Sequence, residues 1–558
     1  MTGLTGVCDD LVEALSRAHP LRATAMGLPG HDAELPDHTR AGGERHRDRL
    51  TAVAARAAAI DPAALDPQER ITRAVLLRAV ADELVDLDVR AVEYTVVDSW
   101  VSPAVELLFA LPGTVLTGRP GADAYLARLS AVPSALDALA ERHRVGMAEG
   151  RLPVRSLVRD AVTFVDRYLD HPDRDPLRRP EPPTDAGSFH ADRFRAERDR
   201  LLAERVRPAY ARYRDALAAE VMPRSRPDDR PGLCWLPGGT RSYAALCRRH
   251  TGTARDPDDL HRAGLDLIAR LDAEYADLGA RALGESDPAR VRRRLREDPA
   301  LRWHDADELL THARATVARA EAAAPGWFGR PPDHRCEVRP VPVDLAPGAV
   351  GAYYEPPALD GGRPGVYHVN THRVEERHRH AGEATAFHEA VPGHHVQHCA
   401  ARGLVGLPLL RRIQEYTAYG EGWGLYAERL ADEMGLYSDD LARLGMVAAD
   451  SIRAARLVVD TGLHAHGWSH ERATAYLRAN TAMSEVDVES ETDRYIADPG
   501  QALAYMVGRL EFQRLRAEAG RRLGARFDVR AFHDTVLGNG ALPLTVLAEV
   551  VAAWTGDA

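Results

Sequence analysis

The sequence predicts a mostly α-helical fold with one small β-sheet. Apolar residues recur at helical spacing through most of the 558 residues, for example over 71–84 and 260–271. Only the stretch 336–370 instead shows short runs of β-branched residues between turn-forming ones. Helices should therefore form the body of the molecule, with a few strands in one place.

Along the chain, proline-rich breaks near 171–187, 223–240 and 325–333 separate helical segments and are read as loops between helices. Within 336–370 we expect strands that form a hairpin with an exposed edge, although an irregular proline-rich loop is the alternative. Helical periodicity resumes at about Glu376 and continues almost to the end.

Composition excludes several classes of function. The chain is 45% hydrophobic and 28% charged, as expected of a folded globular protein. Its net charge of −11 argues against nucleic acid as a partner, because phosphate contacts need clustered positive charge. All 72 basic residues are arginine, so the chain has neither a Schiff-base lysine nor a P-loop.

Cysteine usage and apolar runs bear on the compartment. The five cysteines are scattered and form no C-x-x-C pair, which indicates a reducing environment. The N-terminal sequence MTGLTGVCDDLVEAL has no basic region followed by an apolar one, and no run approaches 18 apolar residues. We expect a cytoplasmic protein without a membrane partner.

The strongest chemical signal is AFHEAVPGHHVQH at 386–398. His388 and Glu389 are adjacent, as in the zinc motif H-E-x-x-H, where two imidazoles four residues apart share a helix face. Here Pro392 occupies the fourth position and cannot bind a metal. The alternative interpretation is an exposed histidine-rich helix without a metal.

Two histidines compete for the role of second ligand. On a regular helix His395 lies only about 20° around the axis from His388, whereas His394 lies about 240° away. Pro392 with the following glycine should disrupt the helix, however, and a broken turn would allow His394 to take the ligand position. Spacing alone leaves both open.

A second cluster, YTAYGEGWGLYAE, occupies 416–428. Glu421 and Glu428 are seven residues apart and share one helix face. Because a catalytic zinc site commonly takes two histidines and one glutamate, Glu421 is a plausible third ligand. Glu428 would then orient a ligand histidine by accepting a hydrogen bond from the ring nitrogen that does not bind the metal.

Several segments together resemble the DUF885 family of bacterial proteins. They are HEAVPGHHVQ, EGWGLYAE, RLVVDTGLHAHGW at 456–468, PGQALAYMVG at 499–508, the strand region 353–370 and AHPLRATAMGLPGHD at 18–32. Members look like gluzincin-type zinc peptidases, similar to helical oligopeptidases and carboxypeptidases with a deep channel. The resemblance implies a large helical zincin with a small β-sheet near the metal helix. Residues 1–330 would wall the channel, and 331–558 would hold the edge strands, the metal helix and the Glu421 helix.

The resemblance also implies the site residues. His388, His394 and Glu421 become ligands of a Zn²⁺ ion, and Glu389 becomes the general base. The glycine-histidine pair of helical peptidases aligns with Gly393 and His394, which favours His394 over its neighbour.

A third cluster around 494–505 supplies candidates for substrate contacts. Zinc peptidases need a donor beside the metal for the oxyanion, and Tyr505 is the first candidate, with His395 second. Arg494 could bind a substrate carboxylate through two parallel hydrogen bonds, with Gln501 beside it. The strand that includes Tyr354 would align an extended peptide through main-chain hydrogen bonds.

These residues predict a zinc-dependent hydrolase that cleaves an amide or peptide bond in a small peptide or peptide-like substrate. A zinc enzyme of small-molecule biosynthesis, acting on a non-peptide amide or by non-hydrolytic chemistry, is the first alternative. A non-catalytic binding protein is the second. We expect no nucleic-acid partner, and a homodimer is the candidate assembly.

Overall fold

The computed structural model describes residues 3–182, 191–343, 346, 349–359 and 363–556. Its helices before the sheet are α1 (Leu4–Ala18), α2 (Pro20–Ala25), α3 (Arg40–Ala58), α4 (Pro67–Val89), α5 (Pro103–Ala110), α6 (Gly118–Ala148), α7 (Arg155–Asp170), α8 (Ala191–Leu201), α9 (Arg207–Ala216), α10 (Gly239–Thr251), α11 (Pro257–Leu283), α12 (Pro288–Glu297) and α13 (Ala306–Ala323). The strands are β1 (Glu337–Pro340), β2 (Ala352–Glu355) and β3 (Val366–Val369). The helices after the sheet are α14 (Ala381–Glu389), α15 (His394–Arg402), α16 (Leu409–Ile413), α17 (Thr417–Glu433), α18 (Asp440–His464), α19 (His470–Asn480), α20 (Glu485–Ala497), α21 (Ala504–Leu523), α22 (Val529–Leu537) and α23 (Leu544–Gly556). The prediction of a mostly helical fold is confirmed.

Local sequence explains where many helices begin. The Asp66 side chain accepts a hydrogen bond from the backbone of Glu69, whose own side chain reaches back to the Asp66 backbone, so α4 starts with a capping box. Asp439 caps α18 by accepting from Ala442 N. Such caps satisfy backbone donors that have no partner inside the helix.

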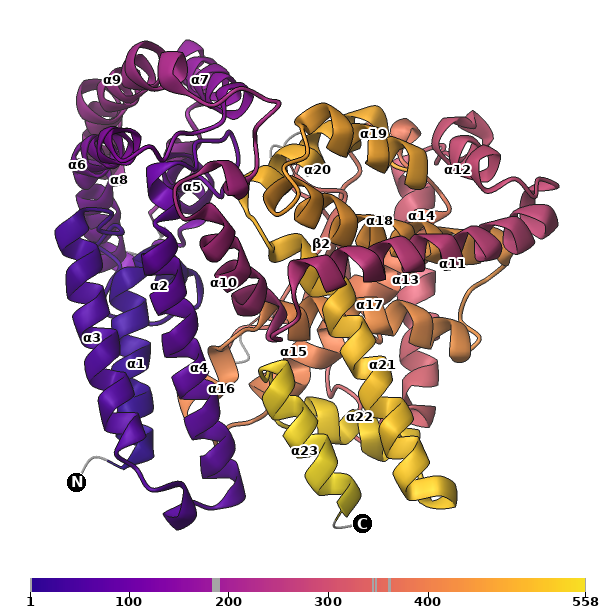
Figure 1. Cartoon of the computed structure of the whole chain (residues 1–558). Helices are drawn as coiled ribbons and strands as arrows, with labels where there is room; N and C mark the ends of the chain where they lie inside the picture. Colours follow the sequence, from indigo (N-terminus) through magenta and orange to yellow (C-terminus); the bar gives the residue numbers. More distant parts are fainter. Residues whose placement is uncertain (1–2, 183–190, 344–345, 347–348, 360–362, 557–558) are drawn as a thin grey trace.

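The N-terminal helices form a layer of their own. Figure 1 shows α1, α3 and α4 side by side, and Leu11, Leu50 and Leu76 pack between them. Helices α6, α7, α8 and α9 pack around a second core that includes Leu129 and Tyr210. None of the described helices combines the length and apolar character needed to cross a membrane.

The largest core lies in the rest of the molecule and positions the site. The long helix α11 packs along α18, and α17 packs along α21 (Figure 1). Leu271 and Val458 belong to the same cluster of buried side chains. This core therefore continues across the sequence boundary near residue 330.

The sheet has the strand order β1-β3-β2. β2 and β3 are antiparallel, as expected of a hairpin, whereas β1 lies parallel to β3 on its other side. The parallel strand was not foreseen from the sequence. Since β2 pairs with β3 on one side only, its other side is an edge of the described sheet.

Candidate metal centre

The helix carrying His388 breaks where the sequence predicts. α14 ends at Glu389, and α15 begins at His394 after the Pro392-Gly393 turn. A Cβ atom at Gly393 would lie 1.9 Å from the backbone oxygen of His388, so only glycine fits this position. The break is therefore built into the sequence by a proline and a glycine.

The turn is held from outside by the EGWG segment of α17. The indole Nε1 of Trp423 donates to the backbone oxygens of Pro392 at 3.0 Å and Gly393 at 3.2 Å. A Cβ atom at Gly424 would lie 2.7 Å from the His388 ring. The tryptophan fixes the turn, and the adjacent glycine leaves space for the imidazole.

The break brings three predicted ligands together. One ligand atom from each of His388, His394 and Glu421 lies within 4.8 Å of the other two. The Nε2 atoms of the two histidines lie 3.5 and 3.8 Å from Oε2 of Glu421. Two ligands bound tetrahedrally at about 2.1 Å would be about 3.4 Å apart, so the spacing suits a zinc ion.

The Nδ1 atoms of the two histidines already have hydrogen-bond partners. Nδ1 of His388 lies 2.8 Å from Oε1 of the buried Glu428, and Nδ1 of His394 lies 3.1 Å from Oε1 of Gln397. Both partners are acceptors, so each Nδ1 donates and each Nε2 presents its lone pair to the cluster. This arrangement of outer acceptors is typical of metal-binding histidines, and the donor set fits zinc.

Charge in the cluster is strongly coupled. Burial lowers the pKa of His388, yet the carboxylates of Glu421 and Glu428 outweigh burial and raise it to about 10. Burial raises the pKa of Glu421, but the two neighbouring histidines reverse this effect and bring it to about 2. His388 and Glu421 therefore favour their charged forms when no metal is bound, and a zinc ion would take the place of the proton on Nε2 of His388.

The carboxylate of Glu389 faces the same space. Burial raises its pKa, partly offset by His388 and His394. No hydrogen bond from another described side chain or backbone group to this carboxylate occurs in the described parts of the chain. It is thus available to a molecule in the cavity.

The cavity beside the cluster has a volume of about 500 Å³. The described residues that line it all fall between 353 and 505. They are Tyr353, Tyr354, Pro356, His388, Glu389, His394, Gln397, His398, Glu415, Tyr416, Thr417, Gly420, Glu421, Arg453, Arg456 and Tyr505. The predicted Tyr354 and Tyr505 are both among them.

His395 does not face this cavity, and its predicted role as an oxyanion donor is wrong. Its Nε2 donates to the backbone oxygen of His334 at 2.8 Å, and its Nδ1 accepts from the Tyr354 hydroxyl at 2.9 Å. The side chain is only 1% exposed. After the break the ring turns toward the sheet, where it fixes the tyrosine.

The substrate-binding roles predicted for Arg494 and Gln501 are also wrong. Arg494 donates to both carboxylate oxygens of Glu491, at 3.0 and 2.8 Å, and to Oε1 of Gln501 at 2.8 Å. Neither residue lines the cavity. Glu491 lies one helical turn before Arg494 and takes up its donors.

The sequence interpretation missed Gln397, Arg453 and Arg456. Gln397 orients His394, and both arginines line the cavity. One signal was present: the arginines are three residues apart in an otherwise apolar part of α18, so they share a face.

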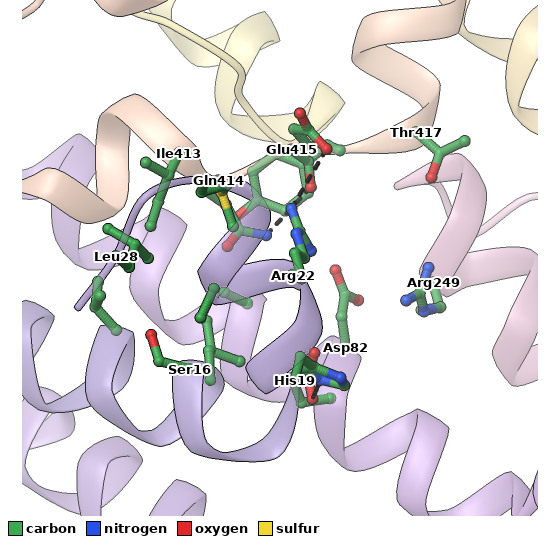
Figure 2. Close-up of a pocket in the computed structure, with 17 residues that line it drawn as sticks. Ser16, His19, Arg22, Leu28, Asp82, Arg249, Ile413, Gln414, Glu415 and Thr417 are labelled. Atoms are coloured by element: carbon green, nitrogen blue, oxygen red, sulfur yellow. Dashed lines mark hydrogen bonds and ion pairs between the residues drawn. The ribbon is translucent and has the colours of Figure 1, made fainter. Parts of the chain in front are cut away.

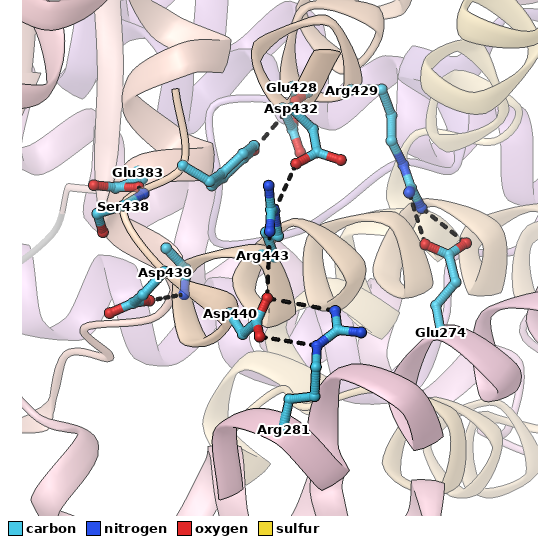
Figure 3. A network of polar contacts seen from close by, with 12 residues as sticks. Glu274, Arg281, Glu383, Glu428, Arg429, Asp432, Ser438, Asp439, Asp440 and Arg443 are labelled. Carbon is cyan, nitrogen blue, oxygen red and sulfur yellow. Dashed lines mark hydrogen bonds and ion pairs between the residues drawn. The ribbon is translucent and has the colours of Figure 1, made fainter. Parts of the chain in front are cut away.

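Ion pairs hold α17, which carries both glutamates, against its neighbours (Figure 3). Arg429 forms an ion pair with Glu274 of α11 at 2.7 Å, and a second one with Asp450 of α18. Arg443 on α18 contacts Asp432 at 2.8 Å. These links fix α17 against α11 and α18.

A second His-His-Glu cluster lies among the N-terminal helices, formed by His19, His46 and Glu83. Both Nε2 atoms lie 3.1 Å from the same Glu83 oxygen, a normal hydrogen-bond distance, and Nδ1 of His46 has no partner among the described residues. The outer acceptors of a metal site are thus missing at His46, and the geometry fits hydrogen bonding.

This second cluster borders a smaller cavity of about 90 Å³ (Figure 2). Arg22 reaches Glu415 across it at 3.3 Å. The segment 415–417 lines both this cavity and the larger one, and therefore forms a wall between them.

Comparison with known proteins agrees with the motifs. The family described as "bacterial protein of unknown function (DUF885)" matches residues 20–551. The chain belongs to the DUF885 family. No curated protein matches it.

Two solved structures share the fold of this DUF885 protein. One is a "putative lipoprotein" from Colwellia psychrerythraea, 26% identical, with a TM-score of 0.91 over 100% of this chain and 99% of the other. The second is a "putative lipoprotein of unknown function" from Shewanella oneidensis, 17% identical, with a TM-score of 0.76 over 99% and 100%. The fold is therefore shared over nearly the whole length of the chain.

Proposed function

We propose that this DUF885 protein is a zinc-dependent hydrolase that cleaves an amide or peptide bond in a small peptide or peptide-like substrate. The observation that supports this most is the placement of Glu389 in one cavity with His388, His394 and Glu421. A zinc ion bound by that cluster would polarise the substrate carbonyl and lower the pKa of water. A solely structural zinc site would have no need of a free carboxylate beside it.

The chain's own groups divide the remaining work. Glu389 would accept the proton of the attacking water and deliver it to the leaving amine, and its raised pKa suits both steps. Tyr505 lines the cavity and is the candidate donor to the developing oxyanion. The open edge of β2, with Tyr353 and Tyr354 in the cavity wall, could pair with an extended substrate.

The test is to incubate the zinc-loaded protein with a library of short peptides and a panel of non-peptide amides, and to identify products by mass spectrometry. The proposal expects cleavage that is lost on chelation and in Glu389→Gln. Cleavage confined to non-peptide amides would favour the biosynthetic alternative. Retention of ligands without any cleavage would favour a binding protein.

A further inference from the structure

Two arginines face the same cavity as the metal cluster. Arg453 and Arg456 lie one turn apart on α18, and both line the cavity. Arg456 is 8% exposed in a part of the helix where most neighbours are apolar. A charge held in such a place needs a partner to offset its lost hydration.

The protein satisfies these arginines only in part. Arg456 donates from Nε to the Tyr495 hydroxyl at 3.0 Å and from one terminal nitrogen to Glu491 at 2.8 Å. Its other terminal nitrogen is buried and has no partner among the described residues. Nε of Arg453 is likewise buried without a partner there, and its closest carboxylate, Glu428, is 3.9 Å away.

Few carboxylates pair directly with these arginines. Glu491 is shared between Arg456 and Arg494, so a single carboxylate serves two guanidinium groups. Arg453 has one ion-pair partner among the described residues, Glu428 at 3.9 Å, and that carboxylate already accepts from His388. Both guanidinium groups therefore have few direct carboxylate partners, and both border the cavity.

The position of this wall relative to the metal cluster follows from Tyr505. The guanidinium of Arg456 lies 4.5 Å from the centre of the Tyr505 ring, and that of Arg453 lies 5.9 Å from it. Tyr505 lines the same cavity as Glu421, so the arginines, the tyrosine and the ligand set border one space. An anion held by the arginines would lie close to the bond presented to the metal.

We infer that Arg453 and Arg456 bind the free α-carboxylate of the substrate, so that the enzyme acts on short peptides or acyl-amino acids next to their C-terminus. This inference rests on the proposed hydrolase function. Guanidinium and carboxylate match as planar, charge-assisted partners, and a carboxylate in the cavity would lie beside both arginines. It also replaces Arg494 as the carboxylate anchor.

The experiment compares an equimolar library of N-acylated tripeptides with free C-termini against the same library amidated at the C-terminus. We expect the free acids to be consumed about 10- to 100-fold faster, the range of one charge-assisted hydrogen-bond pair. Arg456→Gln and Arg453→Gln should each reduce this ratio. Arg443→Gln, on the outer face of the same helix, should leave the ratio unchanged.

Binding separates this inference from the proposed function. Equilibrium dialysis of the native protein with both libraries needs no turnover. Retention of free acids over amides without cleavage would support the carboxylate site and contradict the hydrolase. Cleavage of acids and amides at equal rates would overturn the carboxylate site and leave the hydrolase intact. Equal or absent retention together with no cleavage would overturn both.

Discussion

Nδ1 of His388 on α14 lies 2.8 Å from Oε1 of Glu428 on α17, although the two residues are 40 positions apart in the sequence. Because a carboxylate only accepts, this contact places the ring proton on Nδ1 and leaves Nε2 facing Glu421 and His394. Glu428 is 1% exposed, so the contact is shielded from water. The preorganised imidazole is the structural basis of the zinc-binding predictions below.

Gly424→Ala should weaken zinc binding by at least about tenfold. Its Cβ would meet the His388 ring at 2.7 to 2.9 Å, and the ring must move away from Glu428 or Glu421 to avoid it. Competition with a fluorescent zinc chelator measures the affinity. Gly520→Ala on α21 is the matched control, since nothing lies within 4 Å of its added Cβ, and its zinc affinity should equal that of the native protein.

His395→Ala should keep its zinc while lowering the free energy of unfolding by about 1–3 kcal/mol. The substitution leaves the Tyr354 hydroxyl and the His334 oxygen without their buried partner. His394→Ala, by contrast, should lose zinc. The measurements are the zinc content and the chemical denaturation curve of each variant. If His395→Ala loses zinc and His394→Ala keeps it, then His395 and not His394 is the ligand.

The helical fold was within reach of the sequence because helical periodicity is a local pattern. Pro392 with Gly393 predicted the break in the helix, whereas the choice of His394 over His395 followed from the family resemblance. The direction of His395 was not predictable, because its partner His334 lies on a loop that only tertiary packing brings near.

The arginines illustrate the same limit. Arg494 and Arg456 both contact Glu491, and nothing in the sequence shows which guanidinium keeps free donors. In the folded structure Gln501 accepts a hydrogen bond from Arg494, and Tyr495 accepts one from Arg456. These contacts determine which donors of each arginine remain free. The parallel strand β1 was missed for a similar reason, since its pairing with β3 spans 29 residues at each register position.

Glu389→Gln should retain zinc and lose turnover by on the order of 10²–10⁴. The amide preserves the size of the side chain but cannot accept a proton from water. Glu433→Gln, on the exposed end of α17, is the control and should hydrolyse peptides at the native rate. Near-native turnover in Glu389→Gln would contradict the general-base role.

Asp460 should make the stability of the fold depend on pH. It is fully buried, with Tyr243 donating to Oδ1 at 2.6 Å, and burial raises its pKa to about 7. An unfolded aspartate titrates near about 3.9, so between roughly pH 4 and 7 the folded state holds a proton that the unfolded chain releases. The contribution of Asp460 therefore lowers the free energy of unfolding as the pH rises through this window. Above the window this contribution stays constant.

Asp460→Asn removes that titration. Relative to this variant, the native protein should lose free energy of unfolding as the pH rises from about 4 to about 7, and no further above it. Denaturant titrations of both proteins across this range provide the measurement. A constant difference between them at every pH would show that the carboxyl group titrates normally.

The central claim is that His388, His394 and Glu421 bind zinc, and elemental analysis of purified protein after incubation with Zn²⁺ and gel filtration tests it most directly. The structure predicts about one zinc per native chain and none in His388→Ala. His46→Ala, which alters the other His-His-Glu cluster, should keep the full amount. A native protein without zinc, or a His388→Ala variant that still holds one zinc per chain, would contradict the claim.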